Sequence, residues 1–217
     1  CELGFWRSVI LDSSMPRKDT EYLKGLLKKR RTHKPSHFKP TPPDTSIITD
    51  LIDAARNAPN HHRTQPARFY LLDKKRIRKV GKLFGQVIAG DGNDSFLVEK
   101  GKKKASDWGM SPGLLVVTCF TDLHSDLLCK KPEVAGEDYA TCACICQNLL
   151  LLMEAEGIST KWSTGPVWKH ERFAETIGLR SPQSERVVAL LFYGFCETIL
   201  PQRVLSPLSE QLVSYNK

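Results

Sequence analysis

Two polar segments of this sequence carry side chains that could bind a charged ligand. The first is KKRRTHK at 28–34, in which two adjacent arginines precede a threonine and, two residues later, a lysine. Guanidinium groups form paired hydrogen bonds with phosphate oxygens, and a hydroxyl group adds a further donor. A basic run at a helix end is also common as a solvated surface or a localisation signal. Position alone does not separate these alternatives.

The second polar segment is APNHHRTQP at 58–66, which holds two adjacent histidines, an arginine and a glutamine. Such side chains could simply pair with backbone groups left open by a helix end and by the prolines. A third segment, KWSTGPVW at 161–168, combines tryptophans with hydroxyl groups in the same way. Aromatic rings, polar donors and a cationic cluster together suit a large planar phosphorylated ligand.

Three closely spaced cysteines offer a different chemistry. On a helix, Cys142 and Cys146 share a face while Cys144 does not. The chain contains no CxxC pair, so we predict that these cysteines are small buried side chains and that no metal is bound. Nothing specific supports a cysteine nucleophile paired with His61 or His62. The P-loop, GxGxxG and GxSxG motifs are also absent.

Composition limits the class of protein. The 217 residues are 41% hydrophobic and 26% charged, which is typical of a globular domain, and the net charge of +8 suits an anionic partner. No apolar run is long enough to cross a membrane. Seven cysteines, an odd number, argue against a secreted disulfide framework. We expect the cytoplasm or an organelle interior, including the mitochondrion if a targeting segment preceded Cys1.

Hydrophobic spacing predicts most of the elements that would position these segments. Apolar residues at helical intervals indicate helices at 20–31 and 46–58, the second capped by Asp44 or Thr45. The long apolar run at 137–157, ended by Gly157, predicts a helix with no polar face, buried in a core or between subunits. Residues 74–88 also form a predicted helix, and a short one is expected near 169–179. Strands are predicted at 68–73, 113–122 and 186–195.

Two regions are predicted to lack regular structure. Residues 90–112 are rich in glycine and lysine, which favours a mobile loop with some helix, and residues 161–168 read as a turn-rich loop. Helices and strands do not alternate regularly, so we predict an α+β fold.

The order of these segments resembles the nitroreductase family of FMN-dependent oxidoreductases. The matching pieces are RRT at 30–32, IITDLIDAARNAPNHHRTQPARF at 47–69, the helix ACICQNLLLLMEAEGI, the loop KWSTGP and the strand LLFYGF. The resemblance covers about residues 20–200 and is strongest to the short, single-domain bacterial-type members. It implies a mixed central sheet flanked by helices, with an N-terminal extension at 1–19 and a C-terminal arm at 201–217.

The resemblance also implies a homodimer built on the long helix, with FMN at the subunit interface and no metal. By position, Arg30, Arg31 and Thr32 would hold the FMN phosphate and the flavin edge. Lys34 would approach the flavin ring, Gln65 would close the loop, and Asn57 and His61 would line the flavin, with His61 coming from the partner subunit. Trp162, Ser163 and Thr164 match the loop that returns to the cofactor.

The sequence departs from the family pattern at three of its positions. Ala67 stands where the family usually has tryptophan, and Asn57 and Ser163 replace arginines of near relatives. The resemblance implies ping-pong hydride transfer from NADH or NADPH to electron-poor acceptors such as nitroaromatics and quinones. The alternatives are a specialised flavin enzyme, a non-catalytic FMN-binding protein of the same fold, and, less favoured, a basic protein that contacts nucleic acid through KKRRTHK and EKGKKK.

Overall fold

A computed structural model describes residues 18–215 of the chain. These residues belong to two units, and the predicted extension at 1–19 lies almost wholly outside the described part. One unit holds helix α1 (Lys18–Lys29) together with residues 202–215, in which the short 3₁₀ helix η4 (Leu208–Glu210) lies. The other unit, Arg30–Pro201, contains the sheet and the remaining helices.

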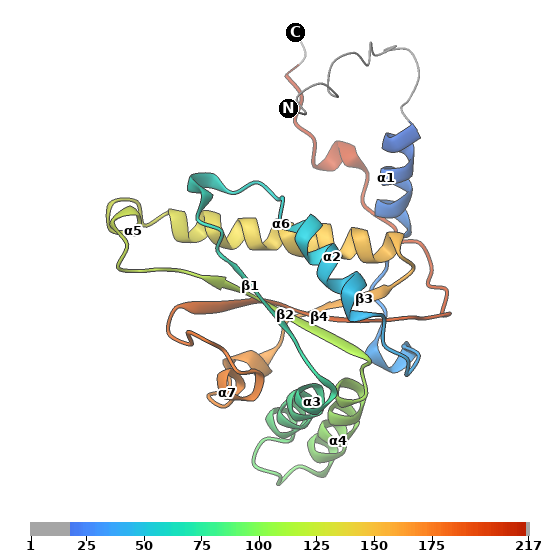
Figure 1. Ribbon diagram of the computed structural model, residues 1–217. Helices are drawn as coiled ribbons and strands as arrows, with labels where there is room; N and C mark the ends of the chain where they lie inside the picture. The colour runs from blue at the N-terminus through green and yellow to red at the C-terminus, as the bar shows by residue number, and fades with distance from the viewer. Residues whose placement is uncertain (1–17, 216–217) are drawn as a thin grey trace. The chain divides into compact units, whose positions relative to one another are not determined.

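The larger unit is built on one four-stranded sheet with the order β1-β2-β4-β3 (Figure 1). Its strands are β1 (Ala67–Leu71), β2 (Gly113–Phe120), β3 (Ser159–Ser163) and β4 (Glu185–Gly194). All three strand pairs are antiparallel. The sheet itself is thus antiparallel, and one isolated parallel bridge joins Thr32 to Thr160 outside the two-strand pairings.

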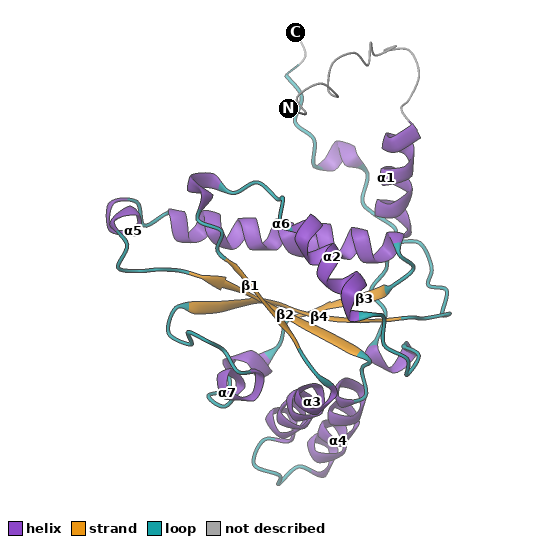
Figure 2. Ribbon diagram, in the orientation of Figure 1, coloured by secondary structure: helices purple, strands orange, loops and turns teal. Residues whose placement is uncertain are grey.

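Helices cover both faces of this sheet (Figure 2). On one face lie α2 (Thr45–Ala55) and α6 (Val134–Ala155), and on the other lie α3 (Lys74–Ala89), α4 (Ser95–Gly109) and α7 (Phe173–Ile177). Strand β2 alternates between the two cores: Leu115 and Val117 face α6, whereas Leu114 and Val116 face α3 and α4. A strand covered on both sides must be apolar along its whole length, as β2 is.

Local signals account for α2 and for the end of α6. Asp44 caps α2, because its carboxylate accepts a hydrogen bond of 2.8 Å from the Ser46 backbone N–H. At the other end of α2, the Asn148 amide donates to the Ala55 carbonyl at 3.1 Å and so satisfies a carbonyl that the helix leaves open. Gly157 follows α6 with φ of 70°, a conformation that favours glycine.

The α6 helix runs across the sheet and buries one side completely. Cys142 and Cys146 are among its fully buried side chains, as their helical spacing predicted, whereas Cys144 is exposed. The outer side of α6 carries small or uncharged residues at intervals of four, three and four. This outer stripe consists of Ala140, Cys144, Gln147 and the half-buried Leu151.

Two sequence predictions were only partly right. Residues 90–112 are mostly helix rather than a loop with some helix, because α4 occupies Ser95–Gly109 and packs closely against α3. Residues 161–168 are not all loop, because β3 extends to Ser163 and the 3₁₀ helix η3 covers Pro166–Lys169. The remaining short elements are α5 (Asp126–Lys130), η1 (Pro35–His37) and η2 (His61–Arg63). Among residues 18–215, no helix combines the length and apolarity that a bilayer span requires.

Candidate functional site

The predicted phosphate-binding segment lies beside β3. Thr32 pairs with Thr160 in the parallel bridge, and the His33 backbone N–H donates to the Thr160 carbonyl at 2.9 Å. This contact brings Arg30, Thr32 and Lys34 to the strand that also carries Trp162 and Ser163. Two segments that are 128 positions apart in the sequence are therefore neighbours, as a shared ligand site would require.

The two adjacent arginines are held differently. Arg31 donates from Nε to the Pro201 carbonyl at 2.8 Å and from Nη1 to the Arg30 carbonyl at 2.8 Å, so part of its guanidinium group is committed to the backbone. Arg30 is half-buried, and within the described part of the chain its side chain makes no hydrogen bond or ion pair. Arg30 is therefore the better placed of the two to bind an anion with its full fork of donors.

A cluster of three lysines extends this site. The Lys161 ammonium group lies 5.6 Å from the centroid of the Trp108 ring. The pKa of Lys161 is lowered, first by burial and then by the positive charge of Lys104, with a smaller contribution from Lys34 and partial relief from Asp107. A half-buried lysine with the positive charges of Lys104 and Lys34 nearby favours a bound anion.

The Trp108 ring beneath Lys161 is held rigidly. It stacks on Phe84 at a centroid distance of 3.9 Å and meets Phe192 at 4.6 Å. Trp108 is 3% exposed, so its contacts with the neighbouring rings fix the surface on which the Lys161 side chain rests. The Trp108 ring also stabilises the Lys161 ammonium group above it, because the face of an indole ring is electron-rich.

The residues predicted from KWSTGP point to different sides of the sheet. Successive residues of a strand alternate between faces, so Lys161 and Ser163 share the face that meets Trp108. Trp162 packs instead against the core beneath α6, and Thr164 is exposed. Ser163 is only 6% exposed. The structure thus brings Ser163 to the lysine cluster, whereas the partly buried Trp162 packs against the core of its own chain.

The second predicted group, Asn57, His61 and Gln65, lies along the first half of α6. A pocket of about 560 Å³ is formed there, and Asn57 and Gln65 line it together with Arg56, Arg63, Arg68 and Thr141. Ala67 also lines this pocket, at the position where the family pattern has a bulky tryptophan. Three arginines beside a cavity of this size make a second region that attracts anions.

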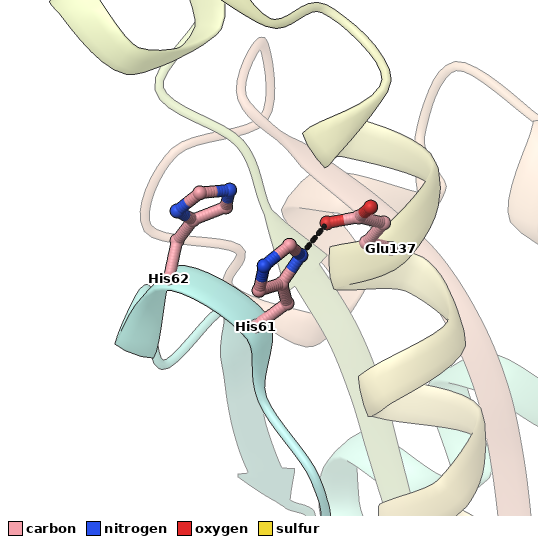
Figure 3. Close-up of side chains that lie close together, drawn as sticks. All are labelled: His61, His62 and Glu137. Carbon is pink, nitrogen blue, oxygen red and sulfur yellow. Dashed lines mark hydrogen bonds and ion pairs between the residues drawn. The ribbon is translucent and has the colours of Figure 1, made fainter.

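Asn57 and His61 make specific contacts next to this pocket. The Asn57 amide donates to the Ala54 carbonyl at 3.1 Å and to the Asp53 carbonyl at 3.3 Å, so it closes the end of α2. The His61 Nδ1 atom lies 2.8 Å from the Glu137 carboxylate on α6 (Figure 3). His61 is not among the residues that line the pocket; its ring instead faces the start of α6.

The backbone of this loop is strained. His62, Arg63 and Gln65 have φ angles of 59°, 54° and 48°, in the left-handed region that residues with a side chain seldom adopt. Each such residue costs on the order of 1–3 kcal/mol and persists only where the surroundings impose it. Three of them within four positions indicate that the surrounding contacts hold this loop in its shape.

One chain does not bring the two groups together. His61 contacts Glu137 near the start of α6, whereas β3 follows Ile158, whose N–H bonds to the Met153 carbonyl near the end of that helix. The 16 residue steps from Glu137 to Met153 span about 24 Å at 1.5 Å per residue. His61 therefore lies near the start of α6, whereas β3 begins near its end.

Sequence reasoning missed Lys104, Lys161 and Trp108 as site residues. Lys161 directly precedes the predicted Trp162, so alternation along a strand would have identified it once residues 159–163 were recognised as β3. Lys104 belongs to EKGKKK, which was considered only as a surface for nucleic acid. No local signal joins Lys104 to Lys161, because their proximity depends on how α4 packs.

Three comparisons with known proteins agree on the fold. The chain is 25% identical over 177 residues to the "Putative NAD(P)H nitroreductase YfhC" of Bacillus subtilis (strain 168), covering 80% of this chain and 84% of that protein. The crystal structure of a nitroreductase-like family protein from Bacillus cereus superposes with a TM-score of 0.73 at 21% identity, covering 90% of this chain and 96% of that one. A nitroreductase with bound FMN from Bacteroides fragilis NCTC 9343 gives a TM-score of 0.69 at 15% identity, with 88% and 98% covered.

The match to a family model covers most of the chain. The Nitroreductase family model aligns with residues 27–195, which include the RRT triplet, the 57–65 loop, α6 and all four strands. The α+β class expected from the sequence agrees with this fold. The chain belongs to the nitroreductase family.

Proposed function

We propose that this protein is an FMN-dependent oxidoreductase that uses NADH or NADPH to reduce electron-poor acceptors such as nitroaromatics and quinones. The observation that carries the proposal is the meeting of Arg30, Thr32 and Lys34 with β3 at a cluster of lysines. Membership of the nitroreductase family and the FMN bound to the Bacteroides fragilis relative support it.

The residues present at this site fit a phosphorylated flavin. Lys161 is half-buried among like charges, and this arrangement costs free energy unless an anion relieves it. Arg30 and the Thr32 hydroxyl offer donors for a phosphate, with Arg31 holding the segment in place through Pro201. Ser163 and Thr164 supply donors for the ring edge, and Lys34 and Lys161 supply positive charge.

Bound FMN would accept a hydride from the nicotinamide and pass it to the acceptor. The protein contributes position and charge to this reaction. Lys34 and Lys161 would stabilise negative charge that builds up on the ring when it is reduced, and the charge of Lys161 is partly shielded from water. In this scheme no side chain forms a covalent bond with the substrate.

We further propose that two copies complete each site. His61 contacts the start of α6, about 24 Å along the helix from Met153, whose carbonyl bonds to the residue before β3. A second chain packed on the outer stripe of α6 could bring its own 57–65 loop to the cluster. The small side chains of Ala140 and Cys144 would allow a close approach of two helices there.

Two alternatives remain within this architecture. A specialised flavin enzyme and a non-catalytic FMN-binding protein would hold the cofactor in the same way. The enzyme would turn over an acceptor of its own, and the non-catalytic protein would turn over none. Nucleic-acid binding is the weaker alternative, because Lys104 and Lys34 of the two basic motifs contribute to the lysine cluster around Lys161 rather than to an open surface alone.

Steady-state oxidation of NADPH separates these functions. Purified protein reconstituted with FMN should oxidise NADPH or NADH continuously when a quinone or a nitroaromatic compound is added. Tight FMN binding without turnover of either acceptor class would favour the non-catalytic alternative. A protein that retains nucleic acid but takes up no FMN would overturn the proposal.

A further inference from the structure

Three metal-ligating side chains meet away from the lysine cluster. His61 and His62 on η2 and Glu137 near the start of α6 each offer one ligand atom, and these three atoms all lie within 4.8 Å of one another. Figure 3 shows the His61 ring between the His62 ring and the Glu137 carboxylate. The two imidazole rings are stacked with their centroids 4.0 Å apart and an interplanar angle of 25°.

The loop that carries the two histidines is fixed to α6 by other bonds. The Thr64 hydroxyl donates to the carboxylate of the buried Asp138, and the Asn60 amide donates to the Thr64 hydroxyl at 3.0 Å. One turn further along α6, the Thr141 hydroxyl donates to the Pro59 carbonyl at 2.9 Å. These contacts hold the imidazoles near Glu137 without help from the imidazoles themselves, so the ligand set is preorganised.

A simple ion pair explains only part of this arrangement. Contact between His61 and Glu137 accounts for two of the three side chains. The His62 backbone is strained at φ of 59°, yet its ring makes no hydrogen bond within residues 18–215. In this strained conformation the His62 ring stacks on the His61 ring. Stacking of two exposed imidazoles contributes little free energy to offset the strain.

We propose that His61, His62 and Glu137 bind a divalent transition-metal ion of borderline softness, such as Zn²⁺. Neutral imidazole and carboxylate are both ordinary zinc ligands, and water would complete a tetrahedral shell. With bonds of about 2.1 Å, tetrahedral ligand atoms lie about 3.4 Å apart. The pair of His61 and Glu137, at 2.8 Å, would open slightly, and His62 would rotate inward at its exposed side chain.

The consequence of binding would be a tighter connection between the 57–65 loop and α6. Ligands from η2 and from α6 would be joined through one ion, in addition to the hydrogen bonds already present. The metal site depends only on residues of the loop and of α6. The proposal of a metal site therefore does not depend on FMN binding, and the flavin content of each sample is measured separately in the test.

The test is a titration of the reduced, metal-free protein with Zn²⁺ by calorimetry, repeated with Co²⁺ as an absorbing probe. Wild-type protein should bind one ion per chain, and the Co²⁺ spectrum should lack the charge-transfer bands of thiolate ligands. His62→Asn and Glu137→Gln should each weaken binding by at least about tenfold, since loss of even outer-shell partners costs 10–100-fold.

Two matched variants serve as controls. His124→Asn removes another exposed histidine, and Glu133→Gln removes a carboxylate one turn before Glu137 on the same end of α6. Both should bind Zn²⁺ like the wild type. The proposal is overturned if wild-type protein binds no ion more tightly than the His62→Asn variant does. Co²⁺ bands from thiolate that persist in both ligand variants would also overturn it, because they would place the ion on the exposed cysteines.

Discussion

The His33 backbone N–H donates a hydrogen bond of 2.9 Å to the Thr160 carbonyl, and this bond joins the RRT segment to β3. On one side of the bond lie Arg30 and Thr32, and on the other lie Lys161 and Ser163. A backbone connection therefore sets how the side chains of the proposed phosphate and flavin contacts lie relative to one another. A site of this kind should tolerate changes of single side chains without loss of the fold.

Arg30→Ala tests the proposed phosphate contact. A charge-assisted hydrogen bond contributes about 1.5–3 kcal/mol, so the variant should bind FMN about 10- to 100-fold more weakly than the wild type. Its melting temperature without FMN should change little, because the Arg30 side chain makes no hydrogen bond or ion pair within residues 18–215. Fluorescence titration with FMN measures the affinity.

Arg76→Ala is the matched control for this experiment. Arg76 is an exposed arginine at the start of α3, where it pairs with Asp73 at 2.9 Å, outside the proposed site. Its removal should leave FMN affinity unchanged. Equal affinities of the wild type and the Arg30→Ala variant would refute the assignment of Arg30.

Lys161 should report directly on anion binding. Its pKa lies below the ordinary value of 10.5 because burial and the charge of Lys104 disfavour the ammonium form. The resulting cost to the folded state is complete below the folded-state pKa and disappears as the pH rises past 10.5. A bound anion offsets this cost, so adding FMN should raise the pKa of Lys161 toward its ordinary value.

Nuclear magnetic resonance of lysine side chains labelled at Cε can follow this change. The Lys161 signal is assigned by its loss in Lys161→Arg, and its titration midpoint is compared with and without saturating FMN. An unchanged midpoint would mean that the phosphate and the flavin bind elsewhere.

Leu151→Glu tests the proposed homodimer. Leu151 is half-buried on the outer stripe of α6, so the charge should disrupt packing between two copies while sparing the core of each chain. Leu150 is unsuitable, because it is 4% exposed and a glutamate there would unfold the chain itself. Light scattering should show monomers. Fluorescence titration should show that these monomers have lost most of their FMN affinity.

Leu123→Glu provides the same substitution at an exposed position outside α6, where the wild-type leucine is 60% exposed. It should remain a dimer. If Leu151→Glu and the wild type have the same mass in solution, α6 is not the subunit interface.

Gly101→Ala and Gly85→Ala test the packing of α4 against α3. A Cβ at Gly101 would lie 2.5 Å from the Gly85 carbonyl oxygen, and a Cβ at Gly85 would lie 2.7 Å from the Gly101 carbonyl oxygen. Backbone atoms this close must move, so each variant should lose roughly 1–3 kcal/mol of unfolding free energy. Denaturant unfolding gives this value.

Gly136→Ala is the control, because nothing lies within 4 Å of a Cβ at that position in α6. Alanine should be neutral there or should stabilise the helix by up to about 1 kcal/mol. If Gly101→Ala proved as stable as Gly136→Ala, the close approach of the two helices would be wrong.

These glycines also explain one limit of sequence-based prediction. The sequence predicted α2, α3 and α6 because apolar spacing and terminal residues such as Asp44 and Gly157 are local signals. Residues 90–112 looked like a loop because glycine and lysine are frequent there. Gly101 instead lets α4 lie close against α3, a requirement set by a partner helix and not by the segment itself.

Prediction of strand β3 and of the site from the sequence was limited in a similar way. Five residues at the edge of a sheet carry little local signal, and β3 is recognisable mainly through its pairing with β4. The resemblance pointed to RRT, the 57–65 loop and KWSTGP, and the structure joins the first and third of these. Placing Lys104 beside Lys161 requires the packing of α4, which no pattern in the sequence expresses.

The most direct test of the proposed function is an absorption spectrum of the purified protein, with the released cofactor identified and counted. We expect a yellow protein with about one FMN per chain, which NADPH bleaches and a quinone restores. A colourless protein that takes up no added FMN, and whose solutions contain only single chains, would contradict it.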